Sequence, residues 1–388
     1  MSKRFAFVLT ALVLAHVAVL LAGFLSPYDF AHQDREMPFA PPVRLRFIDA
    51  GGQFHLRPFV YRMAPVEGAF QQYQEVRDRA YPLRFFVRGA SYSIAGGLTS
   101  SIHLFGADGP ARIYLLGTDG YGRDQFSRLL WGGRISLFAG LLATLLALAL
   151  GTVIGATSGF FGGGVDDVLM RVSELFMAVP WLYLLFAVRA ALPLHIEPAT
   201  AFVLLVAIVG AVGWARPARL VRGIVLSARE RNFVLAARGF GASSFYLVRR
   251  HILPETLGVI LTQAALLVPQ YILAEVTLSF VGLGVGEPVP SWGNMLGTLQ
   301  QYHVLVSCWW MWAPAIVLVP ICIAYGALAD MLQRDALTGH SVPGEVRVGF
   351  FRDWHPYENS LHSGGLGSSS AAGGLSGGAS HGVPQVNR

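Results

Sequence analysis

Long apolar runs constrain this chain more than any other feature of its sequence. A helix needs about 20 apolar residues to cross the hydrocarbon core of a bilayer. Six runs approach or exceed that length: 5–25, 135–157, 169–192, 199–214, 257–283 and 309–332. Only 13% of the residues are charged, whereas roughly 25% is typical of soluble domains. The sequence therefore predicts an all-α integral membrane protein with six transmembrane helices.

The first run could be a signal peptide or a permanent anchor. It follows Lys3 and Arg4, as a signal peptide would. Residues 5–25 are, however, longer than the roughly 7–15 apolar residues of a signal peptide, and Ala22-Gly23-Phe24 is a poor cleavage site. We therefore expect an uncleaved transmembrane anchor.

Arginines indicate the orientation in the membrane. Short cytoplasmic loops are enriched in Arg and Lys, and eight arginines lie between Arg216 and Arg250. With that loop inside, six spans place both chain termini in the cytoplasm, in agreement with Lys3 and Arg4. Thirteen arginines between residues 26 and 134 do not oppose this, because long segments translocate largely regardless of charge. We attribute the net charge of +6 to topology, because these arginines are too scattered to indicate nucleic-acid binding.

The chain divides into four predicted parts. These are an N-terminal anchor helix (1–25), an external segment (26–116), a transmembrane domain with the remaining five spans (117–339) and a C-terminal tail (340–388). In the external segment, residues 44–48 and 54–61 are strand-like, and 67–79 could form one short helix. The tail is rich in Gly, Ser and Ala, a composition that predicts disorder.

The basic loop between the fourth and fifth long runs, residues 225–254, has the pattern of helix, break, helix. Gly241 can adopt the left-handed conformation that ends a helix, and Ser243 or Ser244 can cap the next helix through its hydroxyl. Ala236, Ala237 and Gly241 would form a small, smooth surface that another protein can approach closely. A basic loop made only of turn residues is the simpler alternative, but it would not predict this spacing.

A second candidate site precedes the second span, in residues 117–124, which we call the external signature loop. It contains Gly117, Thr118, Asp119, Gly122, Arg123 and Asp124. Glycines with two aspartates could indicate a metal or phosphate loop, but the spacing does not fit a calcium-binding hand. We expect a tight turn that packs over the mouth of a pore.

The fifth run contains an acid, Glu275, together with Ser279 and Pro269. An ionised side chain in the middle of a span costs about 2.5–3.5 kcal/mol on insertion scales, so Glu275 must face other helices or water. It could lock two helices together through hydroxyl or amide groups. Alternatively, these three residues could line or gate a pore.

Several motifs together resemble a known family. Residues 225–254 resemble the loop by which ABC-importer permeases dock on a separate ATPase, with Leu235-Ala236-Ala237-Arg238-Gly239-Phe240-Gly241 followed by His251-Ile252-Leu253-Pro254. The external signature loop, Gly159-Phe160-Phe161-Gly162-Gly163 and Pro290-Ser291-Trp292-Gly293-Asn294 resemble the permeases of dipeptide, oligopeptide and nickel importers. The resemblance covers about residues 1–30 and 113–339.

The resemblance implies a type I ABC-importer permease fold with a large external insert after the first helix. This chain would form half of the translocation pore for a peptide or related small solute in a bacterial inner membrane. The implied partners are a second homologous permease, two ABC ATPases that bind ATP and Mg²⁺, and an extracytoplasmic solute-binding protein. The loop 225–254 becomes the implied coupling loop, with Glu230, Ala236, Ala237, Gly241, Ser243 and Pro254 as its ATPase-docking residues.

The sequence departs from the family pattern at three places. Leu235 stands where the coupling loop of the family has Glu, although Glu230 is present five residues earlier. His251 stands where an aliphatic residue is expected. The insert between residues 31 and 112 is longer than in many relatives, so its role stays open.

The sequence argues against an enzyme. Its single lysine, Lys3, excludes the Gly-x-x-x-x-Gly-Lys-Ser/Thr phosphate loop. We therefore expect no catalytic residues, no bound cofactor and no metal site in this chain, with ATP bound by the partners. The alternatives are a secondary transporter or channel, which would not need a docking loop, and an intramembrane enzyme, for which no span offers a convincing Ser and His pair.

Overall fold

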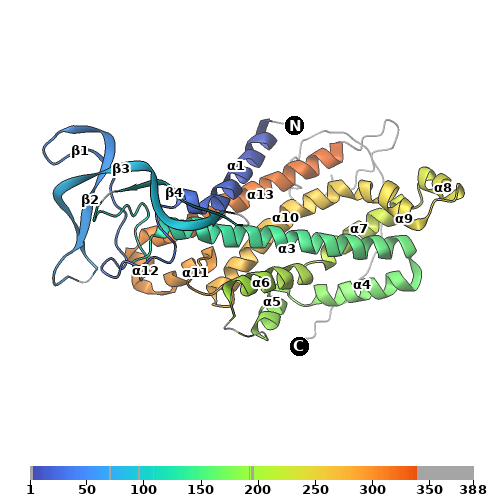
Figure 1. The fold of residues 1–388 in the computed structure, drawn as a ribbon. Coiled ribbons are helices and arrows are strands. Elements are labelled where there is room, and N and C mark those ends of the chain that lie inside the picture. The colour runs from blue at the N-terminus through green and yellow to red at the C-terminus, as the bar shows by residue number, and fades with distance from the viewer. Residues whose placement is uncertain are drawn as a thin grey trace, which may run out of the picture. The chain divides into compact units, whose positions relative to one another are not determined.

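The structure is a computed structural model that describes residues 3–338, except 70, 95, 96, 108, 192, 194 and 195. The predicted C-terminal tail, 340–388, lies outside the described residues. Two kinds of structure make up the described part: long helices, and a β-sheet near the start of the chain (Figure 1).

The helical part contains most of the chain. Its α-helices are α1 (Lys3–Leu20), α2 (Ala22–Leu25), α3 (Gln125–Phe161), α4 (Gly163–Ala178), α5 (Trp181–Ala190), α6 (Pro198–Val212), α7 (Ala215–Ala228), α8 (Asn232–Gly239), α9 (Ser244–Leu247), α10 (Leu253–Phe280), α11 (Trp292–Gly297), α12 (Tyr302–Ser307) and α13 (Ala313–Thr338). A π-helix, η1 (Val248–Ile252), joins α9 to α10, and two 3-10 helices, η2 (Thr298–Gln300) and η3 (Trp309–Trp312), flank α12.

Candidate membrane spans agree only in part with the six predicted runs. Within the described residues, four helical segments are long and apolar enough to cross a bilayer: Lys3–Leu20, Gln125–Phe161, Ser244–Phe280 and Trp309–Arg334. The third and fourth runs are instead bent pairs. The axes of α4 and α5 differ by 86°, and those of α6 and α7 by 45°. Six spans result if each bent pair counts as one.

The break between α4 and α5 has a local cause. A residue before proline avoids the helical region, and Val179, which precedes Pro180, has an extended backbone with φ −84° and ψ 131°. The break between α6 and α7 follows Gly213. Pro217 lies in the first turn of α7, where its missing N–H removes no helical hydrogen bond.

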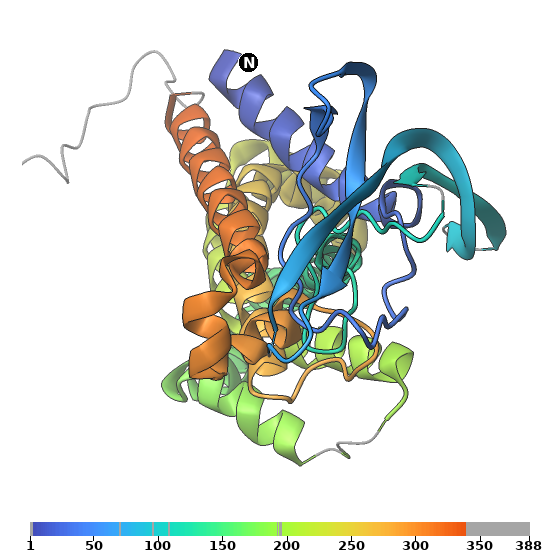
Figure 2. The ribbon, with the colours of Figure 1, turned by 90° about the vertical axis from the view of Figure 1, so that its left-hand side faces the viewer.

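The prediction of an all-α chain is wrong for the external segment. Residues 46–107 form an antiparallel sheet, ordered β1-β2-β3-β4, with β1 (Arg46–Ile48), β2 (Phe54–Pro65), β3 (Tyr73–Ile94) and β4 (Leu98–Ala107) (Figure 2). The two strand-like runs are confirmed as β1 and β2. The short helix at 67–79 is wrong, because Tyr73 opens β3 and pairs with Pro65 of β2. Pairing with β2, rather than the polar pattern of residues 67–79 itself, makes residues 73–79 a strand.

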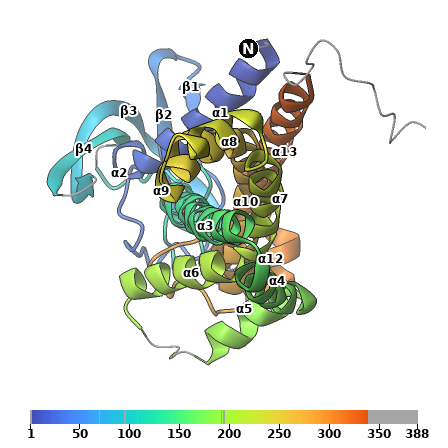
Figure 3. The same cartoon turned by 90° about the vertical axis from the view of Figure 1, so that its right-hand side faces the viewer.

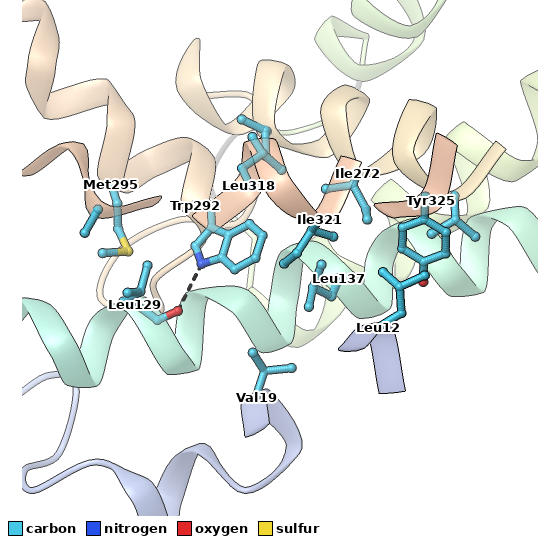
Figure 4. Close-up of a cluster of buried hydrophobic side chains, with 13 residues drawn as sticks. Leu12, Val19, Leu129, Leu137, Ile272, Trp292, Met295, Leu318, Ile321 and Tyr325 are labelled. Atoms are coloured by element: carbon cyan, nitrogen blue, oxygen red, sulfur yellow. Dashed lines mark hydrogen bonds between the residues drawn. The ribbon is translucent and has the colours of Figure 1, made fainter. Parts of the chain in front are cut away.

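The helices meet in a buried apolar cluster (Figure 4). Leu12 and Val19 of α1, Leu137 of α3, Ile272 of α10 and Leu318, Ile321 and Tyr325 of α13 belong to it. Trp292, at the start of α11, is 1% exposed, and its indole nitrogen donates to the carbonyl oxygen of Leu129 at 3.0 Å. This bond ties the loop after α10 to α3.

Glycines let neighbouring helices approach α3 closely. A Cβ on Gly140 would lie 2.4 Å from Ile272 Cγ1 of α10, and one on Gly155 would lie 2.3 Å from the carbonyl oxygen of Ala218 in α7. Small residues at such crossings bring backbones together and increase van der Waals contact, the main attraction between helices in lipid. The packing of α10 and α7 on α3 therefore depends on these glycines.

Replacing Gly140 with Ala should destabilise the chain. The added Cβ must push apart α3 and Ile272, and overpacking of this kind costs about 1–3 kcal/mol. Gly258→Ala is the matched control, because a Cβ there meets nothing within 4 Å. It should be neutral or slightly stabilising. Melting temperatures in detergent, read by size-exclusion chromatography, compare the two variants. Equal melting would contradict close packing at Gly140.

Candidate functional site

The external signature loop forms a tight turn. Asp119 accepts backbone hydrogen bonds at Oδ1 from Tyr121 at 2.9 Å and from Arg123 at 3.0 Å. Gly117 and Gly122 have φ of 63° and 73°, values that favour glycine. A Cβ on Gly122 would lie 1.8 Å from the carbonyl oxygen of Asp34. The chain that follows α2 therefore packs directly against this turn.

Two arginines next to the turn share their acids. Arg123 Nε donates to Asp119 Oδ2 at 2.7 Å, and Arg128 Nε lies 3.4 Å from the same oxygen. Both guanidinium groups also contact Glu287, with 3.0 Å between Arg128 Nη2 and Glu287 Oε1. Burial disfavours the charged form of Arg123, but the contacts with Glu287 and Asp119 outweigh this effect. The pKa of Arg123 is therefore raised. The cluster joins the start of α3 to the loop after α10.

Sequence reasoning missed Glu287. It lies 164 positions from Arg123, and no spacing rule connects them. Only the buried arginine side chains, 5% and 2% exposed for Arg123 and Arg128, show that an acid must lie nearby, because buried charges need partners.

Asp124 caps α3 and is buried. Its Oδ2 accepts a hydrogen bond from the Ser127 amide at 2.8 Å and another from the Ser127 hydroxyl. Burial raises the pKa of Asp124 to about 7, although the bonds from Ser127 act in the opposite direction. The folded chain therefore favours the protonated carboxyl. The stability that this protonation adds is present below the ordinary pKa of Asp and is lost as the pH rises through about 7.

Glu275 and Ser279 lie inside the chain in this conformation. Glu275 is completely buried, and the hydroxyl of Ser279 donates to its Oε1 at 2.6 Å. Pro269 lies in the middle of α10 and is half-buried. Both residues belong to α10, so this bond lies within one helix, and a lock between two helices stays a prediction. A pore or gate role for these three residues stays a prediction.

The coupling loop lies at the end of the helical part opposite the sheet (Figures 1 and 3). The first predicted helix of this loop is interrupted, because α7 ends at Ala228 and α8 starts only at Asn232. Gly241 has φ of 83°, which confirms the predicted left-handed break. Ser243 accepts the Tyr246 amide at 3.3 Å and so caps α9 as expected.

The coupling loop has a buried base and an exposed surface. Val234, Leu247 and Ile252 are buried against Val221 and Val225 of α7. The predicted docking residues Glu230, Ala236, Gly241, Ser243 and Pro254 are exposed, and Ala237 is half-buried. A Cβ on Gly241 would meet nothing within 4 Å. These residues therefore leave their outer faces free within the described chain.

Exposed apolar side chains lie next to those positions in the sequence, and sequence reasoning singled out only Leu235 among them. Phe240 is 94% exposed, Phe245 74%, Tyr246 50% and Leu235 49%. Exposed apolar groups of this size are a feature of protein contact sites, so docking at this loop stays a prediction. Beside them lies a groove between α7 and α10, whose walls include Ser227, Pro254 and Gly258 and whose rim carries the Arg231–Glu255 ion pair at 3.2 Å.

Two of the three departures from the family pattern, Leu235 and His251, lie in this loop. Leu235 adds to the exposed apolar patch in place of an acid. The ring of His251 lies 6.0 Å from that of Phe233 and 5.6 Å from that of Tyr246. His251 therefore packs α8 against the helix that follows it.

Known proteins resemble this chain. Residues 151–337 match the family described as "Binding-protein-dependent transport system inner membrane component". The chain is 37% identical to the dipeptide transport system permease protein DppC of Bacillus subtilis (strain 168), over 59% of this chain and 69% of that protein. It is also 37% identical to the oligopeptide transport system permease protein OppC of the same organism, over 61% and 76%.

One solved structure gives a weaker likeness. An inward-facing structure of the MetNI methionine ABC transporter matches 53% of this chain and 95% of its own, with 16% identity and a TM-score of 0.40. The matched family region begins at residue 151, so the sheet at residues 46–107 lies outside it.

Replacing Glu287 with Gln should destabilise the chain. The substitution leaves two buried arginines with Asp119 as their remaining acid, and hydrogen bonds to charged groups contribute about 1.5–3 kcal/mol each. Glu174→Gln is the control, because its partner Arg171 is 82% exposed and surface pairs contribute about 0–1 kcal/mol. Melting in detergent should fall clearly only for Glu287→Gln. A wild-type melting temperature for that variant would contradict the role of the cluster.

Proposed function

The chain belongs to the family of inner-membrane components of binding-protein-dependent transport systems, and we propose that it is a permease subunit of an ATP-driven importer of di- or oligopeptides. The peptide assignment comes from the DppC and OppC relatives. The chain lacks the lysine of a phosphate loop, so a partner must bind the ATP. The exposed surface of the coupling loop supports the proposal, because such a partner could dock there.

We infer that this surface docks on an ABC ATPase subunit. Its base is fixed by buried apolar residues, whereas Phe240 and Phe245 have no cover within the described chain. Small residues beside them, Ala236 and Gly241, would let a partner surface approach the backbone. A force applied at this surface would pass directly into α10, because η1 continues into α10 without a break.

The full importer would contain four further subunits. A second homologous permease would complete the pore, two ATPases would bind ATP and Mg²⁺, and a solute-binding protein would deliver the peptide from outside. The sheet at residues 46–107 would lie on the side of the binding protein. This chain itself would have neither a catalytic residue nor a cofactor.

We further propose six spans with both termini in the cytoplasm of a bacterial cell, in the inner membrane. Five arginines that follow α7 support a cytoplasmic coupling loop: Arg229, Arg231, Arg238, Arg249 and Arg250. Counting each bent pair as one span supports the number six. The external signature loop and the sheet would then share the external side.

Replacing Gly241 with Val should abolish coupling while leaving the chain in the membrane. A β-branched residue is strained at φ of 83°, and its side chain would hold the ATPase away from the loop. We expect co-purification of the ATPase subunits to be lost and peptide uptake to fall by at least about tenfold, which corresponds to about 1.4 kcal/mol of docking free energy. Uptake into cells and affinity purification from their membranes measure both.

Gly282→Val is the matched control for that experiment. Gly282 also has φ of 83°, and a Cβ there also meets nothing within 4 Å. It lies at the other end of α10, so the backbone strain is the same but the docking surface is untouched. If Gly241→Val retains its ATPases and transports at matched membrane levels, the coupling loop is wrongly assigned. A wild-type chain that purifies alone and hydrolyses ATP would refute the proposed function itself.

Cysteine labelling tests the topology. In a chain with Cys308 and Cys322 replaced by Ala, a single Ser243→Cys should react with a membrane-impermeant maleimide only in inverted vesicles. A single Gln53→Cys, at an exposed position before β2, should react only in intact spheroplasts. Labelling of both cysteines from one side would rule out the six-span orientation.

A further inference from the structure

A cavity lies where both bent spans break. Its volume is about 130 Å³, and its walls include Pro180 between α4 and α5 and Gly213 between α6 and α7. The third wall is α10, through Gln270 and Tyr271. A single water needs only about 10–15 Å³ on this measure, so the cavity has room for a group of several heavy atoms.

The cavity is electropositive. The N-termini of α5 and α7 both open onto it, through Trp181 and Ala215. Neither helix has a side-chain cap at that end, and a helix N-terminus carries partial positive charge. Arg216 adds a full charge, and the described residues that line the cavity include neither Asp nor Glu. This environment favours an anion.

Tyr271 supplies an independent sign of a ligand. It is 2% exposed, yet its hydroxyl has no hydrogen-bond partner among the described residues. The hydroxyl points at Gly213, because a Cβ built on that glycine would lie 1.7 Å from it. A buried hydroxyl without a partner costs free energy, and a ligand oxygen in the cavity would supply the missing acceptor.

We propose that this cavity binds the terminal carboxylate of the transported peptide. The inference rests on the proposed function and adds the place of contact. Arg216 supplies the charge, and the Tyr271 hydroxyl and the Gln270 amide donate hydrogen bonds. Phe176 and Trp181 form an apolar wall against the neighbouring side chain of the peptide.

The position of the cavity fits a passing substrate. Both breaks lie within the bent spans and away from their ends. Secondary transporters commonly bind anionic substrates at interrupted helices, where the N-termini of the half-helices point at the negative charge. Pro269, predicted from the sequence as a pore residue, directly precedes Gln270 of the cavity wall.

Binding of trialanine and of its C-terminal amide tests the proposal. The purified chain, with the subunits that co-purify with it, is placed in lipid nanodiscs without a binding protein and titrated by calorimetry. The wild type should bind trialanine more tightly than the amide. Tyr271→Phe should weaken trialanine binding about fivefold, the loss of one hydrogen bond of about 1 kcal/mol, and Arg216→Gln should abolish the preference for the carboxylate.

Two matched variants control for non-specific effects. Tyr183→Phe removes a hydroxyl from α5, and Arg219→Gln removes a charge from α7, and neither residue lines the cavity. Both should bind trialanine as the wild type does. The proposal is overturned if wild-type protein binds both peptides equally or not at all, or if Tyr271→Phe and Arg216→Gln bind like the controls. Uptake assays test separately whether the complex imports peptides. A wild-type complex that binds trialanine but imports no peptide would refute only the proposed function.

Discussion

The close contact of α3 with α10 and α7 is the constraint on which the remaining structure depends. In lipid, helices gain little from the hydrophobic effect on meeting one another, so contact area must come from packing. Gly140 lets α10 approach α3, and Gly151, Gly155 and Gly159 let the backbone of α7 approach it. At the far end of α3, Ser158 donates to Asp166, and Asp166 pairs with Arg222 of α7. α3 is therefore held along its whole length.

This rigid packing connects the two ends of the molecule. At one end, Arg123, Arg128 and Glu287 fix the start of α3 to the loop after α10. At the other, the buried base of the coupling loop rests on α7. α10 runs between these ends and carries the buried hydrogen bond between Ser279 and Glu275 on its way. A partner that moves the exposed surface of α8 and α9 would therefore act on the same helices that hold the external loops.

The two bent spans interrupt the otherwise regular helical packing. A straight helix exposes no free N–H groups in the middle of the membrane, whereas a broken one does. The breaks at Pro180 and Gly213 place two helix starts beside Arg216 and beside the Tyr271 hydroxyl, which has no hydrogen-bond partner in the described part of the chain. The backbone N–H groups of these helix starts thus supply partial positive charge. A further charged side chain in the cavity would cost more desolvation free energy.

The sequence by itself determined the features that arise from neighbouring residues. Run length identified the apolar helices, Gly241 the left-handed break, and Ser243 the cap of α9, because each depends on local backbone chemistry. Tertiary structure decided the rest. Pairing with β2 made residues 73–79 a strand rather than a helix, and Glu287 met Arg123 only through folding. The sequence also did not reveal that Phe240 is exposed, or that the Tyr271 hydroxyl has no hydrogen-bond partner among the described residues. Burial and hydrogen bonding depend on groups that are distant in the chain and become neighbours only once the helices pack.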